Sequence, residues 1–171
     1  MIRTISRMAL MILSFSLMLY AGYALHASLP IAVSISGEDP VKTEAIKSLE
    51  VLNAPPEKIN KLATGITLAS KATGLSSSLI TCIMSTESSF NERAVSPKNY
   101  KGLMQTPSAT FIYSDVDILH GARILKDKLS MTNDNLYEAL TLYKGGKNSL
   151  ARKQAQEVID LYKKVKNEIQ V

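Results

Sequence analysis

Glu87 is a carboxylate on what the sequence predicts to be the apolar face of a helix. Ile80, Ile83 and Glu87 are spaced i, i+3 and i+7, so they share one face. Apolar neighbours and the negative end of the helix dipole both disfavour a charged carboxylate near the helix C-terminus, and so favour its protonated form. A carboxyl group that holds a proton near neutral pH can act as a general acid. The position of Glu87 on this helix face does not by itself indicate catalysis. A glutamate that turns to solvent at a fraying helix end is the simpler explanation.

The other residue types that support catalysis are scarce. Cys82 is the only cysteine, which excludes an intrachain disulfide and leaves too few ligands for a structural zinc site. The two histidines, His26 and His120, are far apart in the sequence. The sequence has no glycine-rich phosphate loop and no plausible Ser/His/Asp arrangement. We therefore expect neither a metal nor a cofactor.

The basic residues are scattered rather than clustered. The net charge of the 171-residue chain is +5, and several lysines lie late in the sequence, among them Lys163, Lys164 and Lys166. A nucleic-acid site would gather basic residues and interleave them with aromatic side chains. The pattern instead indicates a solvated basic helix face and no nucleic-acid partner.

The N-terminus has the pattern of an export signal. Arg3 and Arg7 precede an apolar stretch, residues 8–27, in which His26 is the only ionisable side chain apart from tyrosine. A stretch of about 20 residues is also long enough to span a bilayer, so an uncleaved inner-membrane anchor is the alternative. No cysteine comes directly after the stretch, which excludes a lipoprotein. Either way we expect the body of the protein outside the cytoplasm, in the periplasm or cell envelope.

The elements that must position Glu87 are all predicted to be helices. Residues 1–27 are the signal peptide or anchor, 28–56 a linker with a short helix at 43–52, 57–146 the catalytic domain, and 147–171 a C-terminal amphipathic helix packing on it. Gly74 is the predicted C-cap of one helix, and Ser76 or Ser77 the N-cap of the next. Asp115 or Asp117 is expected to open a later helix, and Asn133 or Asp134 to cap another. No segment shows strand alternation, so the predicted class is all-α, a compact multi-helix domain.

Several short motifs follow Glu87 at characteristic distances. Glu87-Ser88 is followed by Val95-Ser96-Pro97, by Gly102-Leu-Met-Gln105, by Gly121-Ala-Arg123 and by Tyr143-Lys-Gly-Gly146. This succession resembles the soluble lytic transglycosylase (SLT domain) family, which is related to goose-type lysozyme. The resemblance covers about Ile66 to Gly146 and implies a lysozyme-like fold.

The resemblance also implies a reaction. The family cleaves the bond between N-acetylmuramic acid and N-acetylglucosamine in peptidoglycan, using one glutamate first as acid and then as base, and leaves a 1,6-anhydro end. That role would fall on Glu87, without the second carboxylate that most glycosidases use. The substrate-binding positions would be Ser88, Ser96, Gln105 and Tyr143, with the Tyr143 hydroxyl contacting the glutamate or the substrate.

Two departures from the family pattern leave alternatives open. Gln105-Thr106-Pro107 stands where Gln-x-Met-Pro is usual, and Lys144 stands where asparagine is usual. A hydrolytic lysozyme, a non-catalytic peptidoglycan-binding or envelope-assembly module, and a membrane-tethered helical interaction protein are the other hypotheses. A secretion or conjugation machine of the cell envelope is a partner suggested by family analogy alone.

Overall fold

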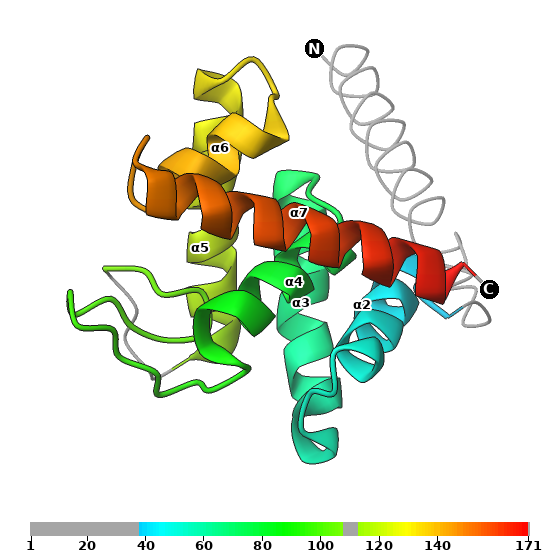
Figure 1. Ribbon diagram of the computed structural model, residues 1–171. Coiled ribbons are helices and arrows are strands. Elements are labelled where there is room, and N and C mark those ends of the chain that lie inside the picture. Colours follow the sequence, from blue (N-terminus) through cyan, green and yellow to red (C-terminus); the bar gives the residue numbers. More distant parts are fainter. Residues whose placement is uncertain (1–37, 108–112, 171) are drawn as a thin grey trace, which may run out of the picture. The chain divides into compact units, whose positions relative to one another are not determined.

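The computed structural model describes residues 38–107 and 113–170, and all of their regular elements are helices (Figure 1). The helices are α2 (Pro40–Val51), the 3-10 turn η1 (Pro56–Lys58), α3 (Ile59–Thr73), α4 (Ser77–Ser88), α5 (Ser114–Met131), α6 (Leu136–Tyr143) and α7 (Ser149–Ile169). The all-α class is therefore confirmed for this part of the chain. The predicted leader, residues 1–27, and the first ten residues of the linker lie outside the described residues. Among the helices that are described, none has the length and apolar character needed to cross a membrane.

The helix boundaries follow from local chemistry, with some corrections to the predicted caps. Gly74 ends α3 with a left-handed φ of 73°, as predicted, because glycine adopts this conformation without a steric penalty. The N-cap of α6 is Asn135, whose side chain accepts from the Glu138 backbone N–H, rather than Asn133 or Asp134. The start of α5 was also predicted too late.

The first residue of α5 is Ser114 and its N-cap is Tyr113, so neither Asp115 nor Asp117 opens the helix. Both aspartates lie in the first turn instead, where negative charge is favourable toward the positive end of the helix dipole.

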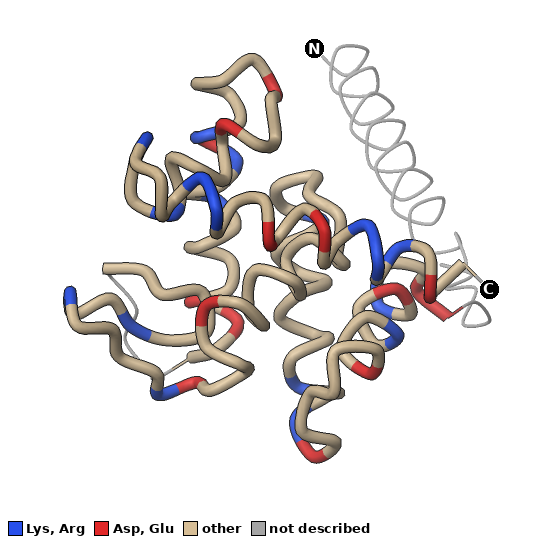
Figure 2. The backbone as a smooth tube through the Cα atoms, in the orientation of Figure 1, with Lys and Arg blue, Asp and Glu red and all other residues tan. Residues whose placement is uncertain are grey.

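The core is shared by all six α-helices of the described residues. α3 packs on α5, while α7 crosses α4 and α2 and also packs on α6 (Figure 1). Each helix contributes side chains that are fully buried, among them Leu49, Ile66, Ile83, Ile118, Leu140 and Val158. Charged residues of both signs are distributed over most of the described elements (Figure 2). α2 is thus a packed part of the domain body, although it precedes the segment predicted to be catalytic.

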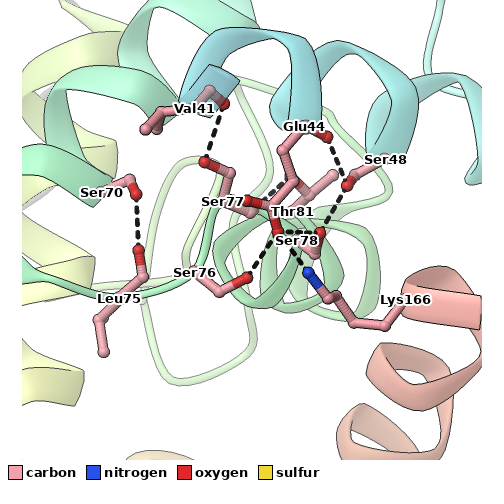
Figure 3. Close-up of polar contacts among 10 residues, drawn as sticks. All are labelled: Val41, Glu44, Ser48, Ser70, Leu75, Ser76, Ser77, Ser78, Thr81 and Lys166. Carbon is pink, nitrogen blue, oxygen red and sulfur yellow. Dashed lines mark hydrogen bonds and ion pairs between the residues drawn. The ribbon is translucent and has the colours of Figure 1, made fainter. Parts of the chain in front are cut away.

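A carboxylate on α2 joins three helices (Figure 3). Oε1 of Glu44 accepts hydrogen bonds from the Ser76 hydroxyl at 2.9 Å, the Ser78 hydroxyl at 2.7 Å and the Lys166 ammonium at 3.2 Å. Ser76 is the N-cap residue of α4, but no capping hydrogen bond from its side chain is present, because the hydroxyl reaches Glu44 instead. The Ser48 and Ser78 hydroxyls are buried and lie 2.9 Å apart, so the polar contact continues into the core.

These contacts determine the charge state of Glu44. Burial alone would raise the pKa of its carboxyl group, but the hydrogen bonds from Ser78, Ser76 and Lys166 and the charge of Lys166 together hold it below its ordinary value of 4.5. A carboxyl group whose pKa is lower in the folded state stabilises the fold above its unfolded pKa. That contribution is lost as the pH falls through the folded pKa.

We expect Glu44→Gln to lower the free energy of unfolding by about 1 kcal/mol at pH 7, since hydrogen bonds to a charged acceptor are replaced by weaker ones. The difference from the unmodified protein should shrink as the pH falls below the ordinary glutamate value of 4.5. Urea unfolding at a series of pH values measures both effects. Glu50→Gln, at an exposed position on the same helix, is the control. Equal stability of Glu44→Gln and the control at pH 7 would contradict this role for Glu44.

Candidate active site

Glu87 lies in the last turn of α4, immediately before a sharp change of chain direction. Ser89 and Phe90 follow with left-handed φ values of 49° and 62°, a conformation that costs a non-glycine residue about 1 kcal/mol or more. Phe90 is 3% exposed, and burial of its ring compensates for the unfavourable backbone. The helix therefore ends at the Glu87-Ser88 pair, and the loop that carries the other candidate residues begins there.

The Glu87 carboxylate forms an ion pair with Lys144, the residue that follows α6. The Lys144 Nζ lies 2.9 Å from Glu87 Oε1, and the two side chains are 4% and 17% exposed. The ammonium also donates to the Thr86 hydroxyl at 3.1 Å. A covered ammonium needs a counter-charge of this kind. The sequence did not predict a cation beside Glu87, so the ion pair with Lys144 is an addition to its expected surroundings.

Two hydroxyl groups hold the Gly102–Gln105 segment against the helices. The Ser88 hydroxyl donates to the Leu103 carbonyl oxygen at 2.9 Å and also to that of Met84 at 3.0 Å. The Tyr143 hydroxyl donates to the Met104 carbonyl oxygen at 2.8 Å. Consecutive carbonyl groups of one loop are thus bound by the two candidate residues that flank the ion pair.

The Tyr143 hydroxyl was predicted to contact the glutamate or the substrate, and the described hydrogen bond is to the loop backbone. Burial, followed by the negative charge of Glu87, raises the pKa of the Tyr143 phenol well above its ordinary value. The phenol therefore stays protonated and remains a hydrogen-bond donor.

Gln105 and Ser96 stabilise the same loop from within. The Gln105 side-chain nitrogen donates to the carbonyl oxygens of Ala94 and Gly102, at 3.1 and 2.9 Å, and the residue has a left-handed φ of 47°. The Ser96 hydroxyl accepts from the Tyr100 backbone N–H at 3.0 Å. These bonds use the side-chain nitrogen of Gln105, so its amide group closes the loop from within.

Met104 is fixed by a close approach from α5. A Cβ atom added at Gly121 would lie 2.6 Å from Met104 Cβ and 2.7 Å from its sulfur, so only glycine allows this contact. Met104 itself is 1% exposed. The glycine was noticed in the sequence as part of a motif, but its role as a seat for Met104 required the spatial arrangement.

Glu92, a carboxylate on the loop after α4, is engaged in structural contacts. Glu92 Oε1 lies 2.7 Å from the Lys61 ammonium and accepts from the Ser114 hydroxyl at 2.8 Å. The hydrogen bond from Lys61 is the main cause that lowers the pKa of Glu92. Glu92 therefore joins the start of the loop to α3 and α5 and is a stable carboxylate.

Metal and thiol chemistry find no support in the described residues. These contain no group of three or more His, Cys, Asp or Glu side chains that could hold a metal ion. Cys82 is buried, and burial raises the pKa of its thiol to about 12, which keeps it from acting as a nucleophile. Cys82 is completely buried and forms part of the core.

Two hollows of about 490 and 410 Å³ open beside α2 and are lined by residues such as Lys47 and Thr43. Neither hollow includes Glu87 or any other candidate residue.

Comparison with known proteins gives one match. The model of the transglycosylase SLT domain family matches residues 65–165, which is more than half of the chain. Searches of curated proteins and of solved structures found no significant match. The matched segment contains Glu87, Lys144 and the loop of residues 89–107.

We expect Gly121→Ala to displace Met104 and the loop around it, because the new Cβ would overlap Met104 Cβ, which is close to the backbone and cannot rotate away. Such overpacking costs typically about 1–3 kcal/mol of unfolding free energy. Urea unfolding measures the loss, and Lys126→Ala, at an exposed position on the same helix, is the control. If the two variants are equally stable, Met104 is not seated on Gly121 as described.

Proposed function

The chain belongs to the transglycosylase SLT domain family, and on that premise we propose that it is a lytic transglycosylase that cleaves the glycan strands of peptidoglycan. The observation that carries the proposal is the position of Glu87. It is a partly exposed carboxylate at the point where α4, the end of α6 and the loop of residues 89–107 meet. All the candidate residues that the sequence identified lie on these three segments.

The proposed reaction needs one carboxyl group. Glu87 donates its proton to the glycosidic oxygen between N-acetylmuramic acid and N-acetylglucosamine as the bond from that oxygen to C1 breaks. The resulting carboxylate then takes the proton of the muramyl C6 hydroxyl as its oxygen bonds to C1. The proton gained by the leaving sugar is replaced by the proton taken from the C6 hydroxyl, so the enzyme returns to its starting state.

The surrounding residues support this chemistry through the loop. Ser88 and Tyr143 bind the Leu103 and Met104 carbonyl groups, and Gln105 and Ser96 stabilise the turn beside them. In the proposal the rigid loop presents the Gln105 side-chain oxygen and neighbouring backbone to the sugar. Positioning of this kind supplies much of the rate enhancement when a substrate must be held in a reactive geometry.

Two other functions predict different products. A hydrolytic lysozyme would use water in place of the C6 hydroxyl, and its fragments would be heavier by one water. A non-catalytic peptidoglycan-binding or envelope-assembly module would release no fragments. The non-catalytic function explains the Lys144 ammonium beside Glu87 without further assumptions.

Localisation and partners form part of the proposal. Arg3 and Arg7 before the apolar stretch support export to the periplasm or cell envelope, where peptidoglycan lies, with retention at the inner membrane as the alternative. Work with a secretion or conjugation machine remains a prediction from family analogy.

Incubation of the purified protein with peptidoglycan sacculi, followed by mass spectrometry of the released fragments, tests the proposal. We expect fragments with 1,6-anhydromuramyl ends. Glu87→Gln should lower their release by about 100-fold or more, because the amide cannot donate and recover a proton as the carboxyl group does. Glu57→Gln, at an exposed position far from the loop in sequence, is the matched control.

Fragments heavier by one water would replace the proposal with the hydrolytic function. Absence of release, combined with equal binding of sacculi by the unmodified protein and Glu87→Gln, would replace it with the non-catalytic function.

A further inference from the structure

We propose that the side chain of Tyr100 is a stacking surface for a sugar of the glycan strand, next to the bond at which Glu87 acts. The inference rests on the proposed function and deepens it, because it assigns a binding contact to a residue outside the motifs that predicted the site. Tyr100 belongs to the loop of residues 89–107, which leaves the end of α4 (Figure 1).

Residues 95–101 form a short hairpin that fixes the Tyr100 backbone. The Ser96 backbone N–H donates to the Tyr100 carbonyl oxygen at 2.8 Å, and the Tyr100 backbone N–H donates to the Ser96 hydroxyl at 3.0 Å. One step nearer the base of the hairpin, Val95 and Lys101 pair as an isolated antiparallel bridge. A contact residue whose backbone is already held loses less conformational freedom on binding, which favours affinity.

The two faces of the hairpin differ in the side chains they carry. Successive residues of a paired strand point to opposite faces, so Tyr100 lies on the face opposite to Val95 and Lys101. The next pair toward the base on the Tyr100 face is Ala94 and Gly102, and the Gly102 N–H donates to the Ala94 carbonyl oxygen at 2.9 Å. Both residues are small, so no bulky side chain of the hairpin stands between the Tyr100 ring and the base.

The base of the hairpin is attached beside Glu87. Gly102 is followed by Leu103, whose carbonyl oxygen accepts from the Ser88 hydroxyl at 2.9 Å, and Ser88 follows Glu87 in the chain. Three residues of extended chain span at most about 11 Å, so the Cα atom of Tyr100 lies within that distance of the Leu103 Cα atom. This range suits contact with a sugar beside the cleaved bond, clear of the reacting atoms.

The chemistry of a tyrosine side chain fits a sugar ring. The aromatic ring offers a flat apolar face with a polar tip, and the C–H groups of a pyranose form an apolar face that can lie against it. Tyrosine also provides a large contact area at a small cost in conformational entropy, because it has only two side-chain torsions. Tyr100 is 41% exposed, so part of this surface is accessible to a ligand.

The charge of the surrounding loop fits an anionic strand. Residues 93–107 contain three basic side chains, Arg93, Lys98 and Lys101, and no aspartate or glutamate. Arg93 and Lys98 are exposed. The peptides attached to the muramyl groups of a peptidoglycan strand carry carboxylates, so positive charge around Tyr100 attracts the strand toward the ring.

The test compares Tyr100→Ala with Tyr100→Phe, which keeps the ring, in the full-length protein. Val95→Ala is the matched control, because Val95 is a 56% exposed apolar residue on the opposite face of the same hairpin. Calorimetry with a muramyl-containing tetrasaccharide measures binding after each change is combined with Glu87→Gln, which prevents cleavage. Fragment release from sacculi by the proteins that keep Glu87 gives kcat and KM, and urea unfolding reports whether each variant is folded.

We expect Tyr100→Ala to raise the Kd for the tetrasaccharide roughly tenfold, as truncation of an aromatic contact does at a binding surface. KM should rise by a similar factor while kcat changes little, because the ring contacts a part of the strand that does not react. Tyr100→Phe and Val95→Ala should bind as the unmodified sequence at these positions does.

Three results would overturn the stacking role: unchanged binding by folded Tyr100→Ala, an equal loss in Val95→Ala, or an equal loss in Tyr100→Phe. If the tetrasaccharide binds through Tyr100 but the unmodified protein releases no fragments, the proposed catalytic function fails and the stacking contact stands. If the Glu87→Gln protein does not bind the tetrasaccharide at all, the stacking contact is overturned, and fragment release from sacculi still decides the proposed function.

Discussion

The pairing of Glu87 with Lys144 constrains the arrangement of this domain more than any other contact near the candidate site. It requires the C-terminal end of α4 and the end of α6 to meet, and it places the ammonium of a side chain that is 4% exposed beside the one carboxylate that the family motif singles out. A covered ion pair is costly to form unless its geometry is good, and breaking it leaves an uncompensated charge. The fold must therefore supply both ends of the pair at once, and the tight turn at Ser89 and Phe90 lets the loop leave α4 without displacing Glu87.

Around this pair, side-chain hydroxyl groups shape the backbone. Ser88 and Tyr143 each bind one carbonyl group of the loop, and Gly121 leaves the space in which Met104 sits. At the other end of α4 a similar principle applies, since hydroxyls from Ser76 and Ser78 converge on Glu44. Both ends of α4 are thus fixed by polar contacts, while its centre is held by apolar packing. A helix held in this way keeps Glu87 in place with little freedom.

The sequence was sufficient to predict the helical class, the end of α3 at Gly74 and a helix that carries Glu87 on the same face as Ile80 and Ile83, because these depend on spacing along one helix. It predicted the caps of α5 and α6 less well, since several neighbouring polar residues can cap a helix and tertiary contacts select among them. The partner of Glu87 could not be predicted, because Lys144 lies 57 positions farther along the chain and no local pattern joins the two. The unusual lysine was noticed, but only the three-dimensional arrangement showed that its ammonium reaches Glu87.

The central claim is that Glu87 faces the scissile bond of a bound glycan strand. A crystal structure of Glu87→Gln soaked with a muramyl-containing tetrasaccharide tests this directly. The claim predicts a glycosidic oxygen within hydrogen-bonding distance of the residue 87 amide, a muramyl C6 hydroxyl on the same side, and a sugar hydroxyl against Gln105. A tetrasaccharide bound beside α2, or bound with residue 87 still covered by Lys144 and out of reach of every glycosidic oxygen, would contradict it.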